Sequence, residues 1–109
     1  HGDGTQSRDF TYVENVTAAN LLACTAPEAA GAAINVACGE RYSLLTLIER
    51  LAEYTGKRPR VVHTQPRAGD VPHSQADISR ARALLGYEPV TSFDEGLRRT
   101  VAWFVARGA

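Results

Sequence analysis

A polar loop between an apolar run and a helix carries the side chains best suited to chemistry. It runs from Thr64 to Ser79 and reads T-Q-P-R-A-G-D-V-P-H-S-Q-A-D-I-S. Pro66 restricts one backbone angle and Gly69 frees another, so we expect a defined turn that presents Arg67 and Asp70. A guanidinium group binds phosphate oxygens in a bidentate manner, and a carboxylate accepts hydrogen bonds from a sugar diol. The loop therefore suits an anionic, hydroxyl-bearing ligand, with a solvated surface turn as the alternative.

The composition is that of one ordinary globular domain. The chain has 109 residues, of which 44% are hydrophobic and 22% charged, so it can form a single core but not two. Twelve basic side chains balance twelve acidic ones, which argues against a nucleic acid or an anionic membrane as partner. No apolar run has the length of a membrane span and no signal-peptide pattern is present, so we expect a cytoplasmic location.

The cysteines, Cys24 and Cys38, lie in apolar stretches without C-x-x-C spacing, and we interpret both as small core residues. A metal site that adds His63 and His73 is the alternative. No pair among these residues has the local spacing of metal ligands, so the sequence predicts no metal site.

Hydrophobic periodicity predicts a small α/β fold. Helices are expected at about residues 16–25, 44–55, 78–85 and 93–106, and strands at 8–13, 33–37 and 60–63. Strand 33–37, helix 44–55 and strand 60–63 follow one another, which predicts two short parallel strands joined by a right-handed crossover helix. The expected N-caps are Asn15, Ser43, Asp77 and Ser92, with Glu95 completing a capping box, and the expected C-terminal glycines are Gly56 and Gly86.

The first residues have the pattern of half a hairpin. Asp3-Gly4 is a strong turn signal, and residues 8–13 alternate polar with aromatic or branched side chains. Only His1 and Gly2 precede the turn, so we expect the chain to begin within a larger structure. An open strand edge at 8–13 and an uncovered face on helix 16–25 then predict self-association through these N-terminal elements, with a monomer whose N-terminus is frayed as the alternative.

Several motifs, read together, resemble one enzyme family. They are G-D-G-T-Q-S-R-D-F-T-Y-V-E-N-V-T-A-A-N-L-L-A, I-N-V-A-C-G, P-R-A-G-D-V-P-H-S and A-D-I-S-R-A-R-A-L-L-G-Y-E-P. The chain resembles the C-terminal, substrate-binding portion of extended short-chain dehydrogenase/reductases that act on nucleotide sugars. The likeness is greatest to the UDP-glucose and UDP-N-acetylglucosamine 4-epimerase type and runs from Gly2 to Phe104. It implies that Arg8 and Arg67 bind the diphosphate of a UDP-sugar and that Asp70 binds its ribose.

The resemblance also implies parts that this sequence does not contain. Enzymes of this family bind NAD through G-x-G-x-x-G in a Rossmann domain and transfer a proton with a Y-x-x-x-K pair. Neither pattern occurs here, so we expect no catalytic and no cofactor-binding residue in this chain. NAD is implied only for a parent enzyme, whose Rossmann domain would lie upstream of His1 or on a separate chain.

Two readings of function stay open. The chain is either the substrate-binding lobe of a nucleotide-sugar 4-epimerase, or a stand-alone, non-catalytic binding module with the same fold. A nucleotide-sugar 4,6-dehydratase or decarboxylase is the alternative parent enzyme. We assign Asp9 and Asp77 to structure. His73 and Ser74 adjoin the ligand loop, where contact with sugar or phosphate and plain solvent exposure are both open.

Overall fold

The computed structural model describes residues 1–108, in which four α-helices flank a two-stranded sheet. The helices are α1 (Val13–Thr25), α2 (Leu44–Thr55), α3 (Ser79–Leu85) and α4 (Phe93–Ala106), with a short 3-10 helix, η1, at Pro27–Ala29. The strands are β1 (Ser7–Arg8) and β2 (Tyr42–Ser43). The α/β class is confirmed, and α2 and α4 have the predicted bounds. No helix in the described part of the chain is long and apolar enough to cross a bilayer.

Local capping signals explain where the helices begin and end. The Ser43 hydroxyl accepts a hydrogen bond from the Thr46 amide at 3.1 Å, and the Ser92 hydroxyl accepts one from the Glu95 amide at 3.2 Å. Gly56 and Gly86 end α2 and α3 in the left-handed conformation, with φ of 68° and 65°. These four predictions are confirmed because each depends on residues within one turn of the helix end. Two others are wrong: the Glu95 carboxylate accepts from Arg98 and Arg99 and completes no capping box, and the N-cap position of α3 is Ile78, not Asp77.

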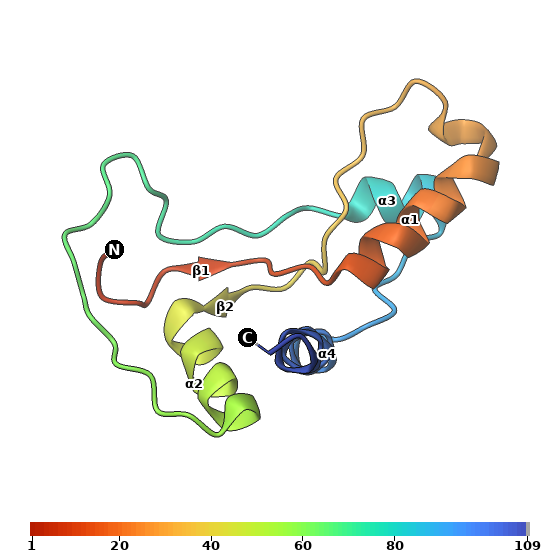
Figure 1. Cartoon of the computed structure of the whole chain (residues 1–109). Helices are drawn as coiled ribbons and strands as arrows, with labels where there is room; N and C mark the ends of the chain where they lie inside the picture. Colours follow the sequence, from red (N-terminus) through yellow and green to blue (C-terminus); the bar gives the residue numbers. More distant parts are fainter. Residues whose placement is uncertain (109) are drawn as a thin grey trace.

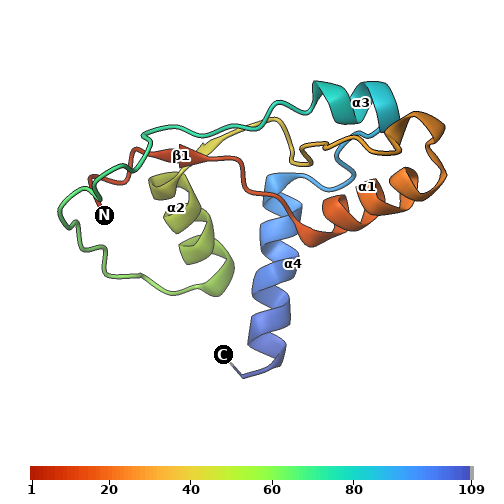
Figure 2. The same cartoon turned by 90° about the horizontal axis from the view of Figure 1, so that it is seen from above.

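The molecule is flat, 49 × 36 × 17 Å, and its helices form two pairs. α1 packs with α3 at one end and α2 packs with α4 at the other, while the extended segments that carry β1 and β2 run between the pairs (Figure 1). Figure 2 shows α4 extending away from the rest of the molecule. This arrangement leaves the start of the chain and the long segment between α2 and α3 side by side at one end.

The best-buried part of the core lies between α1 and α3. Its buried residues are Ala19, Ala37, Ile78, Ala81, Leu85 and Tyr87. The Tyr87 hydroxyl donates to the Ala37 carbonyl at 2.8 Å, which satisfies a buried polar group within an apolar cluster. At the other end, the rings of Tyr42 and Phe93 stack with centroids 4.0 Å apart and join β2 to α4.

The prediction of two parallel strands at 33–37 and 60–63 is wrong, because neither segment forms a strand in the described residues. Segment 33–37 forms no ladder, and side chains bond to the carbonyls at its two ends: Arg80 donates to the Ala33 carbonyl and Tyr87 to the Ala37 carbonyl. Segment 60–63 also forms no strand. Val61 and Val62 are 43% and 66% exposed, so this apolar run has nothing to pack against. The sheet is instead antiparallel, with Ser7 opposite Ser43 and Arg8 opposite Tyr42.

The N-terminal prediction also needs correction. The strand expected at 8–13 is reduced to Ser7–Arg8, and α1 begins at Val13 rather than residue 16. Asn15 therefore lies inside the first turn of α1 and is not an N-cap. It is fully buried, its Oδ1 accepts from the amides of Val90 and Thr91, and its Nδ2 donates to the Thr91 carbonyl. This side chain ties α1 to the segment that leads into α4.

Asp3-Gly4 forms a local turn and not a hairpin. The Asp3 carboxylate accepts from the amide and hydroxyl of Thr5. Gly4 has a φ of 84°, and a Cβ there would lie 2.7 Å from the Leu45 side chain, so only glycine fits the turn against α2. The expected open edge is covered at Ser7, which pairs with Ser43 on one side and bridges His73 on the other.

The prediction that both cysteines are core residues is wrong for Cys24 and only partly met by Cys38. Cys24 is exposed on α1, and Cys38 is only partly buried. Burial nevertheless raises the pKa of the Cys38 thiol above its ordinary value.

Candidate functional site

A parallel bridge between Ser7 and His73 brings the polar loop against β1. The Ser7 amide donates to the Pro72 carbonyl at 2.8 Å, and the Ser74 amide donates to the Ser7 carbonyl at 2.9 Å. These bonds join segments that lie far apart in the sequence. The expected ligand residues Arg8, Arg67 and Asp70 consequently lie in one region of the molecule.

Arg8 and Asp70 form an ion pair. Arg8 Nη2 lies 2.7 Å from Asp70 Oδ1, and the two side chains are 28% and 36% exposed. Arg8 Nη1 also donates to the Ser7 carbonyl at 2.7 Å. A guanidinium group has five N–H donors, so these two bonds leave others for a ligand anion.

The turn that carries Arg67 and Asp70 has the geometry expected from its sequence. The Asp70 amide donates to the Arg67 carbonyl at 3.1 Å, and Gly69 has a φ of 80°. That φ is typical of the third residue of a type II turn, where glycine is preferred. Arg67 makes no ion pair within residues 1–108, in contrast to Arg8.

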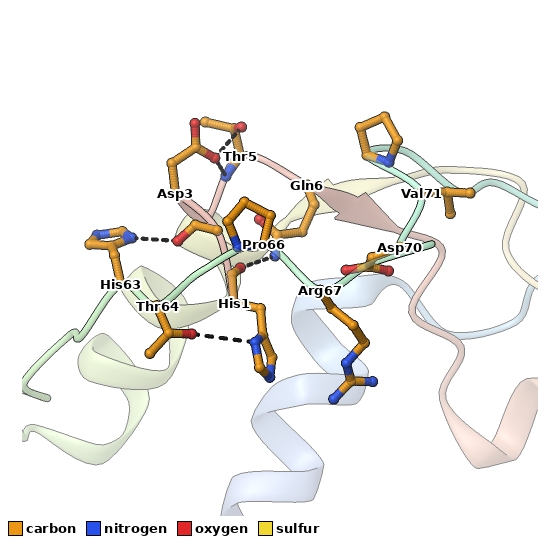
Figure 3. A pocket seen from close by; sticks show the side chains of 12 residues that line it. His1, Asp3, Thr5, Gln6, His63, Thr64, Pro66, Arg67, Asp70 and Val71 are labelled. Atoms are coloured by element: carbon orange, nitrogen blue, oxygen red, sulfur yellow. Dashed lines mark hydrogen bonds between the residues drawn. The ribbon is translucent and has the colours of Figure 1, made fainter.

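A cavity of about 620 Å³ lies between the first residues of the chain and the loop (Figure 3). Its lining comprises His1, Gly2, Asp3, Thr5, Gln6, His63, Thr64, Pro66, Arg67, Asp70, Val71 and Pro72. Arg67 and Asp70 line the cavity. Arg8 does not, and reaches its edge only through the bond to Asp70.

The cavity also contains polar residues that the sequence did not identify. Hydrogen bonds from Thr5 lower the pKa of the Asp3 carboxyl below its ordinary value. His63 bonds to the Gly2 carbonyl at 3.0 Å, and Gln6 donates to the His1 carbonyl at 2.6 Å (Figure 3). Because 60–63 was predicted to be a strand, His63 was not expected to line a ligand cavity. Asp3 was likewise predicted to be only part of a hairpin turn. A polar residue beside a turn was the available signal in both cases.

The structural role of Asp9 is clear from its contacts. Its carboxylate oxygens accept from the amides of Cys38 and Gly39 at 3.1 and 2.8 Å, so it secures the segment before β2. Asp77 accepts from the Ser79 amide at 2.9 Å at the start of α3. His73 bonds to the Ser7 hydroxyl and Ser74 to the Ser7 backbone, so both contribute to holding the loop. No group of potential metal ligands is found among the described residues.

Known proteins are similar to this chain in sequence, and solved structures are similar to it in fold. The chain is 40% identical over 103 residues to a UDP-glucuronate 4-epimerase from Thermodesulfobacterium geofontis, a match that covers 94% of this chain and 31% of that protein. A UDP-glucose 4-epimerase from Thermotoga maritima, solved with UDP-glucose, has a TM-score of 0.84 at 36% identity, covering 99% of this chain and 34% of that one.

A third protein was solved with both a nucleotide sugar and NAD. It is a UDP-glucuronic acid 4-epimerase from Bacillus cereus in complex with UDP-glucuronic acid and NAD. Its TM-score is 0.87 at 32% identity, and the match covers 97% of this chain and 34% of that one. The chain thus spans about a third of the length of the relatives it matches.

A family model described as GDP-mannose 4,6 dehydratase matches residues 1–100. This match covers most of the chain, and the similar proteins above are UDP-sugar 4-epimerases. The chain therefore belongs to the nucleotide-sugar epimerase and dehydratase family that this model describes.

Proposed function

We propose that this chain is the nucleotide-sugar-binding lobe of an NAD-dependent UDP-sugar 4-epimerase. The observation that carries the proposal is the meeting of Arg8 and Asp70, 62 positions apart, beside the cavity that Arg67 lines. Two cationic groups and one carboxylate in one region match the charges of a diphosphate joined to a ribose.

Each side chain has a distinct proposed role. Arg67 has no ion pair within the described residues, so its guanidinium is available to one phosphate without displacing a partner. Arg8 is held in place by Asp70 and the Ser7 carbonyl, and its remaining N–H groups would bind the second phosphate. Asp70 would accept hydrogen bonds from the ribose diol while keeping its bond to Arg8.

The chemical step is proposed to lie outside these residues. The sequence has neither a dinucleotide-binding loop nor a Y-x-x-x-K pair, while the similar Bacillus cereus epimerase was solved with NAD. NAD would remove a hydride from the sugar and return it, and a Rossmann domain on the same or a separate chain would hold it. This lobe would bind and orient the UDP-sugar for that domain.

Titration with UDP, followed by NMR, tests the proposal. We expect weak, saturable binding that falls about tenfold in Arg67→Ala and in Arg8→Ala, because each loses a charge-assisted contact to phosphate. Arg82→Ala is the matched control, since Arg82 lies on α3 and forms an exposed ion pair with Glu88. Shifts that are the same in Arg67→Ala and the parent protein would show that the loop does not bind the diphosphate.

NAD provides a second measurement. Calorimetry is expected to detect no saturable NAD binding to the 109-residue chain and no epimerase activity. Micromolar NAD affinity would contradict the assignment of this chain to the substrate side alone.

A 4,6-dehydratase parent is the second candidate, and the description of the matching family model supports it. Comparison of UDP with GDP in the same titration discriminates between the two. Preference for GDP favours a GDP-sugar dehydratase as the parent, and preference for UDP favours a UDP-sugar enzyme such as the 4-epimerase.

A further inference from the structure

Ser7 uses every polar group it has to join β1 to the ligand loop. Its amide donates to the Pro72 carbonyl, its carbonyl accepts from the Ser74 amide, and its Oγ lies 2.7 Å from His73 Nδ1. Its neighbours bury it to 5% exposure, although serine is usually a surface residue. A buried hydroxyl left without a hydrogen-bond partner costs free energy, so the Ser7 hydroxyl favours loop positions that keep His73 Nδ1 within hydrogen-bond distance.

The loop has few other means of holding its position. Residues 56–72 form no helix or strand, and every side chain in this range is exposed. The Gly2 amide bonds to the Thr64 carbonyl, His1 Nδ1 bonds to the Gln65 carbonyl, and Asp70 pairs with Arg8. Because apolar burial contributes little here, the distance from the loop to β1 depends on the exposed Arg8–Asp70 pair and on the hydrogen bonds to Ser7, and only those to Ser7 involve a buried residue.

The same residue also orients Arg8. The Ser7 carbonyl oxygen accepts from Ser74 and from Arg8 Nη1 at 2.7 Å. Arg8 Nη2 meets Asp70, whose own position depends on the loop that His73 anchors. Displacement of the loop from Ser7 would therefore change both acceptors that hold the Arg8 guanidinium.

We propose that Ser7 and His73 are positioning residues that set Arg8 and Asp70 for a nucleoside diphosphate. This inference rests on the proposed function, because it assumes that Arg8 and Asp70 bind the ligand. It adds a role for two side chains outside the cavity lining, through the Oγ–Nδ1 bond. Neither side chain needs to touch the ligand. A loop that is already held in place binds the ligand without the entropic cost of ordering the loop.

The test measures UDP affinity in variants that remove or restore this bond. His73→Phe and Ser7→Ala are expected to weaken UDP binding about fivefold, the effect of losing one ordinary hydrogen bond. His73→Asn and Ser7→Thr are expected to restore most of the affinity, because each returns a polar atom near the lost one. His73 is exposed, so His73→Phe tests the idea even where Ser7→Ala disturbs the buried strand. Ser79→Ala, at the exposed start of α3, is the matched serine control.

Two further readouts separate positioning from general stability. Exchange of the Ser74 amide is expected to accelerate in His73→Phe, while the Tyr87 amide in the core keeps its rate. The ¹⁵N shift of His73 Nδ1 is expected to change in Ser7→Ala without ligand. Unchanged UDP affinity in His73→Phe, with Arg67→Ala still impaired, would overturn the positioning role and leave the proposed function intact. Absence of any Arg67→Ala effect would overturn both.

Discussion

Arg8 Nη2 and Asp70 Oδ1 lie 2.7 Å apart, joining the second residue of β1 to the last residue of a type II turn. Both side chains are about one-third exposed, so the pair itself adds little to stability. Its importance lies in placing a cation and an anion beside one cavity.

The first prediction separates the two roles of this pair. Asp70→Asn is expected to weaken UDP binding about tenfold, because the ribose loses a charged acceptor. Inorganic pyrophosphate, which has no ribose, should bind as well or up to about fivefold more tightly, since Arg8 is released from an exposed ion pair. Calorimetry with both ligands measures the contrast, with Arg8→Ala as the control that weakens both. Equal losses for UDP and pyrophosphate would contradict a ribose role for Asp70.

The second prediction concerns Asn15. Asn15→Ala is expected to destabilise the fold by about 2–3 kcal/mol, because it leaves the amides of Val90 and Thr91 without their buried acceptor. Urea unfolding followed by circular dichroism measures the loss. Asn20→Ala is the matched control, an exposed asparagine on the same helix. Similar midpoints for the two variants would show that the buried contacts of Asn15 contribute little.

The third prediction is a pH dependence at the start of α4. Hydrogen bonds from Arg98 and Arg99 lower the pKa of Glu95 from 4.5 to about 2. A carboxyl whose folded-state pKa is depressed stabilises the fold above its unfolded pKa, and this contribution is lost as the pH falls from about 4.5 to about 2. Because Glu95 lies at the surface, the effect should be small and sensitive to salt.

Urea midpoints measured from pH 7 to pH 2 test this dependence. The difference between the parent protein and Glu95→Gln is expected to shrink across the acid range. Glu49→Gln is the control, since Glu49 makes no ion pair within the described residues. A difference that stays constant down to pH 2 would contradict the role assigned to Glu95.

The fourth prediction is self-association through the N-terminal elements. β1 is paired on both sides at Ser7, so strand pairing is no longer the favoured route. α1 still exposes Val13 and Leu21, each 67% accessible, and we expect association through this helix at high concentration. Sedimentation should show a concentration-dependent species that Leu21→Lys reduces. A strictly monomeric chain across the range would rule the prediction out.

Local sequence determined the helices and the turn of the candidate site. Ser43 and Ser92 cap α2 and α4, and Gly69 permits the turn that presents Arg67 and Asp70. Each of these features depends on residues a few positions apart, which short-range sterics and hydrogen bonds control. The family resemblance then indicated Arg8, Arg67 and Asp70 as the expected ligand residues, and the structure places these three side chains in one region.

Tertiary structure alone decided which strands pair and which side chains anchor the loop. The apolar runs at 33–37 and 60–63 have strand-like composition, but no neighbouring strand within the described residues forms a ladder with either. Arg80 and Tyr87 bond instead to the carbonyls at the two ends of 33–37. Asn15 looked like a helix cap until its burial against Thr91 gave it a different role. Ser7 and His73 meet across 66 positions, and alternation along a strand does not specify so distant a partner. Pairing across that separation depends on the packing of the whole molecule, because closing so long a loop is favourable only when many distant contacts form together.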